Sequence, residues 1–520
     1  MTEEQKLEKK KSGIIKKIFK WIGLSILTIL FLLAFLFEAP PKIFILLLII
    51  LAAFTALPKP ARKWFLLTAA GVVIALIVWI FLPVNNEGWQ PYKYNFDKEL
   101  EKLQTKYSIP SEENAAIIYN QLMESYDAND YVNLDSDPNI FHGTFKKPWL
   151  SKDYPEIANW FKRNQSIIDT LIEISKINKC LFPLVDPSNP ESQLNRNSAI
   201  RTWSRLLIIA INNDIAEGRP EKAMEKITAI LQMAKHQYQQ PVMLDILNGI
   251  SIETLMLWHL NKIVIENEGM YSQIQIIEKN LPDIKDDWSS VYSKTVEYDK
   301  LCARTELANY YEVNSKGRIR ISRDPWAQLR AVGRELHQDY EIDINQIDAA
   351  LKNILYPSYL QRKLIKAKTI LRWLTMPFDP EQAAEMLTAC LDQYDIMAEP
   401  DFDWTIKPQN PDSFPTWMNV YRLIFYNIHF DQLMADKCAE SNYRLRDSYL
   451  RALTWRRGSR LLIAIKKYKN ENGKWPESLD NIKSLVPAEA LIDPVGGTFD
   501  YKNHGENFSL SGKSINIWPQ

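Results

Sequence analysis

The stretch that decides the fold is residues 199–260, AIRTWSRLLIIAINNDIAEGRPEKAMEKITAILQMAKHQYQQPVMLDILNGISIETLMLWHL. Apolar residues recur in it at helical spacing on both sides of Gly218-Arg219-Pro220, and again after Pro241. Apolar residues three and four positions apart line one face of a helix, and proline suits the first turn of a helix. The pattern therefore predicts three consecutive helices that pack through these apolar stripes.

The turn at Gly218 indicates how closely two of these helices approach. Ala223 follows Gly218 after five residues, and small residues at such positions let neighbouring helices come together. This pair resembles the turn of a tetratricopeptide hairpin, although only one such unit is present. The resemblance implies a layer of helical hairpins and not a full repeat array. It also predicts that Ala223 packs against the preceding helix near Leu207 and Ala210.

Further helices are expected on both sides of this layer. A serine that starts a helix can accept a hydrogen bond from its first backbone N–H groups, and Ser111 is placed to do so. The predicted helical ranges are 96–106, 111–126, 286–313, 324–340, 344–355, 358–375 and 379–397. A proline-rich stretch, 400–415, is expected to be an extended strap.

The segment that follows this strap, 417–469, is predicted to be helical and basic. Arginine at this density suits either the binding of phosphate or acidic partners or a solvated face that pairs with neighbouring Asp and Glu, and the second interpretation is favoured. The arginines concerned are Arg444, Arg446, Arg451, Arg456, Arg457 and Arg460. The alternating basic stretch 316–323 is expected to be an exposed loop or short strand.

Three hydrophobic runs without charged residues, 21–37, 43–57 and 64–84, precede all of this. A helix that crosses a bilayer needs about 20 apolar residues, so the first and third runs qualify and the second is short. Lysines crowd the first 20 residues, the loop between the first two runs carries only Lys42, and the next loop is basic again. Basic loops stay in the cytoplasm. We therefore expect three transmembrane helices, a cytoplasmic N-terminus and an extracytoplasmic segment, 85–520.

Two alternatives to this topology follow from the same residues. If only two of the runs cross the membrane, the large domain is cytoplasmic. A cleaved signal peptide is disfavoured, because the first run lacks a small-x-small cleavage site and is followed by two more apolar runs. The three-span topology places the protein in the inner membrane, with the lipid bilayer as its first partner.

The C-terminal residues, 468–520, have a different character. The sequence YKNENGKWPESL at 468–479 predicts a helix that ends at Asn472-Gly473, because glycine suits the residue after a helix. A short helix near 479–485 and a hairpin of strands 498–502 and 507–511 are expected next. Asp493-Pro494 lies between the short helix and the hairpin. This order of elements resembles the globular end of type II secretion pseudopilins. Two parts of that family's pattern are missing, the prepilin cleavage motif and the Asp-Gly-rich loop, so Asp493 alone is not expected to hold calcium.

The arrangement as a whole resembles a class of bacterial envelope proteins. These proteins combine a membrane anchor, tetratricopeptide-like helices and a pseudopilin-like tail. The block around Asn114-Ala115-Ala116, the helix of Trp160 and the hairpin at Gly218 recur in them in this order. The resemblance implies a location and an architecture, and it implies no activity.

Motifs for catalysis, cofactors or metals are missing from the sequence, so no catalytic, cofactor-binding or metal-binding residue is predicted. The six histidines lack metal-ligand spacing. The calcium-like stretch 135–139 lacks the required glycine and glutamate, and Gly512-Lys513-Ser514 lacks the first glycine of a phosphate-binding loop. His429 and Asp431 are two apart on a predicted helix and would not face each other.

The cysteines and the charge balance give weaker indications. The cysteines are far apart in sequence and are open to three disulfide pairings or to free thiols: Cys180, Cys302, Cys390 and Cys438. Acidic and basic residues number 63 each, so no global field attracts nucleic acid.

The predicted fold class is mainly α, with three N-terminal transmembrane helices, a large soluble domain of helical hairpins and a small α+β tail. The expected N-terminal parts are a basic cytoplasmic tail (1–20), three transmembrane helices (21–84) and a linker (85–110). An α-helical domain (111–398), a strap (399–416), a basic helical region (417–467) and a pseudopilin-like tail (468–520) are expected to follow.

The favoured function is a membrane-anchored extracytoplasmic scaffold that binds protein partners in the cell envelope, without catalytic activity. Helical hairpins form grooves that suit the recognition of peptides or helices. One alternative is an accessory component of a secretion or pilus-like apparatus, based on the tail. Another is an enzyme that modifies envelope polymers, based on abundant Trp and Tyr.

Overall fold

The computed structural model describes residues 88–125, 143–321, 379–392, 394–399, 402–404 and 430–519, the last range with side chains from Ser441 onward. The chain divides into two compact units. The larger unit comprises 91–313, 377–413 and 429–520, and it contains nearly all of the described elements. The described residues are mostly helical.

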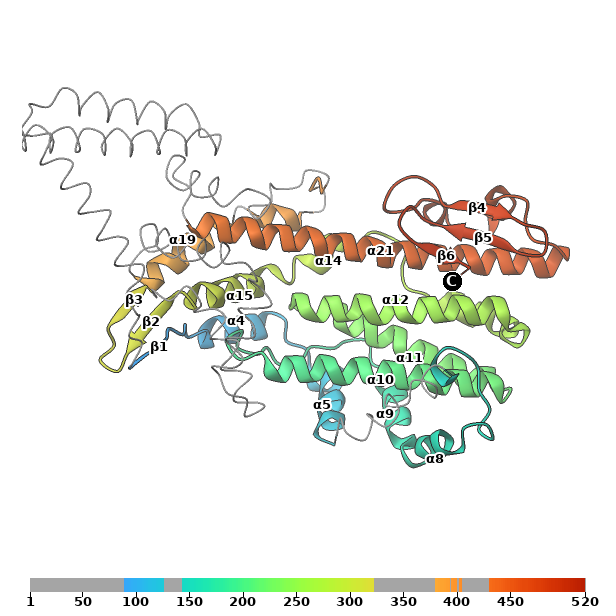
Figure 1. Cartoon of the computed structure of the whole chain (residues 1–520), viewed down its shortest axis with the longest axis horizontal. Coiled ribbons are helices and arrows are strands. Elements are labelled where there is room, and N and C mark those ends of the chain that lie inside the picture. The colour runs from blue at the N-terminus through green and yellow to red at the C-terminus, as the bar shows by residue number, and fades with distance from the viewer. Residues whose placement is uncertain are drawn as a thin grey trace, which may run out of the picture. The chain divides into compact units, whose positions relative to one another are not determined.

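Three long consecutive helices form the centre of the larger unit. They are α10 (Glu191–Ala216), α11 (Pro220–Tyr238) and α12 (Met243–Glu266), and they lie side by side (Figure 1). A still longer helix, α21 (Phe430–Asn472), packs on the other side of α12. The three helices expected from residues 199–260 are therefore confirmed, and the layer gains a fourth helix from nearly 200 residues further along the chain.

Two glycines account for the turns and spacing of this layer. Gly218 lies between α10 and α11 and has a φ of +70°, a backbone conformation that favours glycine. Pro220 occupies the first position of α11, as predicted. At Gly249 a Cβ would lie 2.9 Å from the Cβ of Gln237 and 3.0 Å from the carbonyl of Ala234. The close approach of α12 to α11 therefore depends on glycine at this position.

Shorter helices precede this layer: α4 (Asp97–Lys106), a 3-10 turn η1 (Ser111–Glu113), α5 (Ala116–Glu124), α8 (Pro155–Arg163) and α9 (Gln165–Ser175). The expectation that one helix covers 111–126 with Ser111 as its cap is wrong. The helix α5 starts after Asn114, whose Oδ1 accepts hydrogen bonds from the N–H groups of Ala116 (3.1 Å) and Leu181 (2.9 Å). Its partner Leu181 is distant in sequence.

The region after α12 is more broken than expected. It contains η2 (Glu268–Gln273), α13 (Ile274–Asn280), α14 (Trp288–Tyr292) and α15 (Val296–Ala308). The single helix expected over 286–313 is interrupted at Thr295, whose hydroxyl and N–H both donate to the Tyr292 carbonyl at 2.8 Å. A threonine that bonds the local backbone in this way competes with the helical pattern.

Three short strands lie in two parts of the chain. β1 (Trp89–Pro91) lies in the linker, and β2 (Tyr311–Asn314) and β3 (Ile319–Ile321) follow α15. They form one sheet in the order β1-β2-β3. The last residues of the helix expected over 286–313 are thus in a strand. The basic stretch at 316–323 contains β3, in agreement with the expected short strand.

A further helix, α19 (Pro380–Asp392), packs on α15 and α21 and leads into a 3-10 turn, η3 (Asp395–Ala398). These two elements divide the helix that was expected over 379–397. The helices expected over 324–375 lie outside the described residues, as do the calcium-like stretch 135–139 and most of the proline-rich strap.

The tail begins where α21 ends at Asn472, and Gly473 follows with a φ of +74°. Two 3-10 turns come next, η5 (Leu479–Leu485) and η6 (Ala488–Leu491). The strands are β4 (Asp500–Asn503), β5 (Phe508–Ser511) and β6 (Asn516–Trp518), in the order β4-β5-β6. β4 and β5 form the expected antiparallel hairpin, and β6 pairs with β5 as a third strand.

The tail packs tightly on α21. The side chains of Phe508 and Leu510 are buried in the same hydrophobic core as residues of α21. The centroids of the Trp475 and Phe508 rings are 4.6 Å apart. A Cβ on Gly458 of α21 would lie 2.9 Å from Ile517 of β6. The absence of a side chain at Gly458 therefore leaves room for β6.

The predicted fold class is wrong in its membrane part. Among the described residues, no helix is long and apolar enough to cross a membrane. The long helices carry charged side chains that pair inside the protein; in α12 these include Asp245 and Glu253. The three hydrophobic runs, 21–37, 43–57 and 64–84, lie outside the described residues.

Candidate functional site: a cavity with unpaired acceptors

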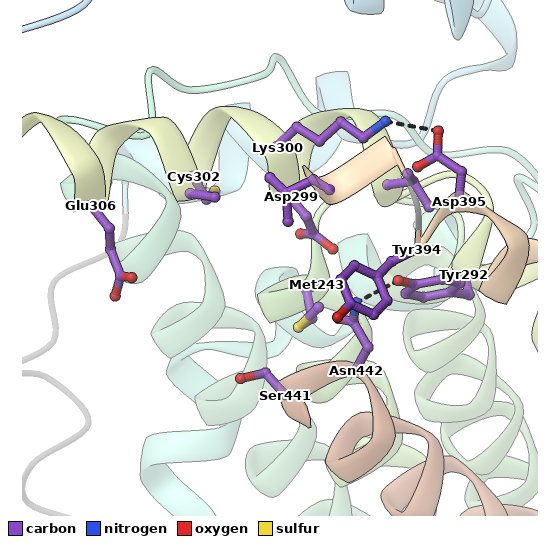
Figure 2. Close-up of a pocket in the computed structure, with 13 residues that line it drawn as sticks. Met243, Tyr292, Asp299, Lys300, Cys302, Glu306, Tyr394, Asp395, Ser441 and Asn442 are labelled. Carbon is purple, nitrogen blue, oxygen red and sulfur yellow. Dashed lines mark hydrogen bonds and ion pairs between the residues drawn. The ribbon is translucent and has the colours of Figure 1, made fainter. Parts of the chain in front are cut away.

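A cavity of about 250 Å³ lies within the larger unit, where the beginning of α12 meets α14, α15, α19 and α21 (Figure 2). Met243, Val296 and Leu391 supply apolar walls. Sites for small organic ligands usually measure about 300–1,000 Å³. The cavity can therefore hold one amino-acid side chain or a small amine, and it is too small for a nucleotide.

Ion pairs hold the walls of this cavity together. Lys300 of α15 donates to Asp392 of α19 at 2.6 Å and to Asp395 of η3 at 2.8 Å. Burial opposes the charged form of Lys300, but its hydrogen bonds to these two aspartates raise its pKa overall. Figure 2 shows the Lys300 ammonium directed toward Asp395 and away from the Asp299 carboxylate. Its charge is therefore already used in joining α15 to η3.

Asp299 is the most unusual group in the cavity. Its carboxylate points from α15 toward Met243 and Tyr394 (Figure 2), and its buried Oδ2 has no hydrogen-bond donor among the described residues. Burial raises the pKa of Asp299 to about 7, and a hydrogen bond with Thr295 offsets this only in part. An acceptor in this state is open to a donor from outside the chain.

Asn442 of α21 presents a second such acceptor. Its side chain is only 7% exposed, and its Nδ2 donates to the Tyr292 hydroxyl (Figure 2). Its Oδ1 is buried and has no donor among the described residues. Two acceptors on facing elements, Asp299 Oδ2 and Asn442 Oδ1, therefore lie in the lining of one cavity with their hydrogen-bonding capacity unused.

The remaining polar residues make the cavity acidic and aromatic. Glu306 and Asp395 also line it, and both are exposed. Tyr292 and Tyr394 contribute aromatic rings. Because Lys300 is the only basic side chain in the described lining and is held by two aspartates, the local charge is negative. The arrangement suits a cation that also has an apolar part.

Sequence reasoning did not identify any of these residues. They come from four separate segments, near 243, 292–306, 391–395 and 441–442, and none of the segments has a motif. His429 and the Asp431 side chain, considered as a pair from the sequence, lie outside the described residues.

The other residues considered from the sequence have structural roles. Asp493 of the pseudopilin-like tail accepts hydrogen bonds from the Thr454 hydroxyl (2.9 Å) and from the N–H groups of Val495 (3.1 Å) and Lys513 (2.6 Å). The Gly512-Lys513 stretch thus closes a loop around Asp493. Among the described residues, no group of three or more His, Cys, Asp or Glu side chains is arranged to hold a metal.

The histidines of the helical layer are buried and neutral. Burial lowers the pKa of His236 to about 4, and its Nε2 lies 2.7 Å from the Ile177 carbonyl. Burial lowers the pKa of His259 to about 3, and its Nε2 lies 2.9 Å from Asn212 Oδ1. The first contact connects α11 to the segment before the layer, and the second joins α12 to α10.

The arginines of α21 form the expected solvated face only in part: Arg444 and Arg451 are exposed. Arg456 and Arg457 are buried. Arg456 binds both carboxylate oxygens of Glu253 on α12, at 2.6 and 3.0 Å, and Arg457 donates to the Ile284 carbonyl at 3.0 Å. The expectation is wrong for Arg456 and Arg457, because other elements cover this side of α21 and the two arginines bind groups of those elements.

Comparisons with known proteins leave the family open. No family model matches the chain, and neither a curated protein nor a solved structure is similar to it.

Proposed function

We propose that the protein is a non-catalytic helical scaffold that binds a segment of a partner protein, and that the cavity receives one side chain of that segment. The observation that carries the proposal is the cavity itself, with apolar walls and two buried acceptors that lack donors among the described residues. Buried polar groups in proteins are nearly always paired. Two unpaired acceptors in one small cavity are well explained by a ligand that pairs with both.

The surface beside the cavity supports a macromolecular ligand. Leu244 and Leu247, in the first turns of α12, are 38% and 39% exposed, and Leu194 in the first turn of α10 is 51% exposed. The buried pair Arg196–Asp245 joins these two helix ends, with a separation of 2.8 Å. The three leucines therefore lie at the end of the layer where Met243 lines the cavity. Clustered exposed apolar residues are typical of protein-binding surfaces.

Rigidity of the layer also supports a scaffold. Four long helices are joined by buried ion pairs, among them Arg196–Asp245 between α10 and α12 and Arg456–Glu253 between α12 and α21. A binding site built on packed helices is held more accurately than one on loops. Two of these helices, α12 and α21, contribute to the cavity walls. The other walls come from α14, α15, α19 and η3, and Lys300 ties α15 to α19 and η3.

The proposal is tested with a variant that blocks the cavity entrance. Ser441 lines the cavity and is exposed, so Ser441→Trp should fill the entrance without disturbing the core. Ser448→Trp is the matched control, because it lies two turns further along α21 and does not line the cavity.

The measurement is recovery of bound proteins on the tagged full chain, combined with a photo-crosslinker at position 247, on the exposed leucine surface beside the cavity. We expect a specific protein that crosslinks at position 247, is lost with Ser441→Trp and is retained with Ser448→Trp. Recovery that is equal for both variants would show that the cavity is not the binding site and would overturn the proposal.

A further inference from the structure

We propose that the cavity binds the ammonium or guanidinium end of a lysine or arginine side chain of the partner, with Asp299 as its counter-ion and Asn442 as a second hydrogen-bond acceptor. This inference rests on the proposed function and names the chemical group that the partner inserts. Three properties of the cavity support it: the two acceptors without donors among the described residues, the negative charge of the lining, and the positions of the apolar and polar lining residues.

The open hydrogen-bonding positions require a ligand with several donors. Asp299 Oδ2 and Asn442 Oδ1 are both acceptors, and both lack a donor among the described residues. An ammonium group carries three N–H donors and no acceptor, and a guanidinium carries five. A carboxylate or phosphate would bring further acceptors to the same place and would leave Asp299 unpaired. The open positions therefore select a cationic donor.

The charge of the lining selects the same kind of group. Asp299, Glu306 and Asp395 contribute carboxylates, and Lys300 is already bound to two aspartates. A cation placed beside Asp299 favours the charged carboxylate, and the pair is strengthened because its surroundings are partly buried. The rings of Tyr292 and Tyr394 also suit a cation, which is attracted to the face of an aromatic ring.

The position of the groups along the cavity fits an extended alkyl chain. Ser441 and Glu306 are exposed, whereas Asn442 and the Oδ2 of Asp299 are buried. Met243 and Val296 contribute apolar walls. Lysine and arginine have an apolar stem and a charged end. Such a side chain can enter beside Ser441, cover the apolar walls with its stem and place its charge at Asp299.

Calorimetric titration of the full chain with four probes tests this inference. Two probes are free molecules, n-pentylamine and its neutral counterpart 1-pentanol. Two carry an alkyl side chain on a peptide unit, with an ammonium end in Nα-acetyl-lysine N-methylamide and without a polar end in Nα-acetyl-norleucine N-methylamide. We expect both amines to bind and both neutral probes to fail, with the lysine derivative at least as tight as pentylamine.

Variants identify the counter-ion. Asp299→Asn keeps the shape of the side chain and removes its charge, and it should weaken amine binding by about tenfold or more, as expected when a charge-assisted hydrogen bond is lost. Glu297→Gln is the matched control, because Glu297 is also a carboxylate on α15 but lies outside the cavity and pairs with Lys106. It should leave amine binding unchanged. Asn442→Leu, which removes the second acceptor, should also weaken binding.

Three results would overturn the inference. They are equal binding of 1-pentanol and pentylamine, unchanged amine affinity in both Asp299→Asn and Asn442→Leu, or binding of free pentylamine without the lysine derivative, which would make the ligand a free amine. The proposed function fails separately. If Ser441→Trp loses a crosslinked protein that Asp299→Asn still binds normally, the scaffold proposal stands and the cation proposal falls. If amines bind at Asp299 but no protein depends on the cavity entrance, the scaffold proposal falls, and the cavity is a site for a free amine.

Discussion

Asp299 lies in a setting that ordinary aspartates avoid. Its Oδ2 is buried without a donor, and its pKa is raised to about 7 because burial disfavours the charged form. An aspartate in an unfolded chain titrates near 3.9. Between these two values the folded protein keeps a proton that the unfolded chain has released. Stability from this group is therefore greatest at low pH, and it decreases as the pH rises from about 4 to about 7.

The replacement Asp299→Asn tests this at the level of one residue. The amide cannot ionise, so the variant should become more stable relative to the wild type as the pH rises. The difference between pH 5 and pH 8 should be on the order of 1 kcal/mol or more, since each pKa unit corresponds to about 1.4 kcal/mol. Urea unfolding at the two pH values measures it. An identical stability difference at both pH values would contradict the raised pKa.

Pairs of elements in this protein are joined by buried charges as well as by apolar contacts. Arg456 of α21 and Glu253 of α12 have side chains that are 6% and 1% exposed, and the Tyr238 hydroxyl of α11 also donates to Glu253. One polar cluster thus connects three helices. Removing one partner of such a pair leaves the other buried and uncompensated.

For this reason Arg456→Met should lower the free energy of unfolding by about 3–5 kcal/mol. Adding Glu253→Gln removes the uncompensated charge and keeps an acceptor for Tyr238, so the double variant should recover part of the loss. Chemical denaturation of the wild type, both single variants and the double variant gives the coupling energy. Strictly additive effects would show that the pair does not act as a unit.

The contact between α10 and α11 is apolar and close. Ala223 is completely buried in α11, which packs on α10. Ala223→Arg should therefore lower the stability by several kcal/mol, because it buries an unpaired charge or separates the helices. Lys222→Arg, at the exposed neighbouring position, is the control. A melting temperature that is unchanged in Ala223→Arg would mean that this face of α11 is open.

At the scale of the whole molecule, the tail is an integral part of the helical core and is expected to fold without calcium. Calcium requires about six to eight oxygen ligands, whereas the Asp493 carboxylate is already bonded by Thr454, Val495 and Lys513. The melting temperature of the intact protein should be the same with calcium and with a chelator. A clear rise with calcium would show that the tail has a metal site as well as a pseudopilin-like order of elements.

The sequence by itself determined the elements whose signals are local. The apolar stripes of 199–260, the break at Gly218 and the first-turn Pro220 predicted α10, α11 and α12, because helical periodicity and turn residues act over a few positions. The same holds for the end of α21 at Asn472 and for the hairpin of β4 and β5. Signals were misleading where a residue bonds to a distant partner, as Asn114 does with Leu181.

Tertiary structure alone decided which residues share an environment. The cavity unites Met243, Asp299, Tyr394 and Asn442, which are separated by up to 199 positions along the chain. Whether an acidic or basic side chain is solvated or buried depends on which element covers it. Arg456 is therefore a core residue although its neighbourhood in sequence is typical of an exposed basic helix. Burial and charge pairing are properties of the packed molecule, and they define the proposed binding site.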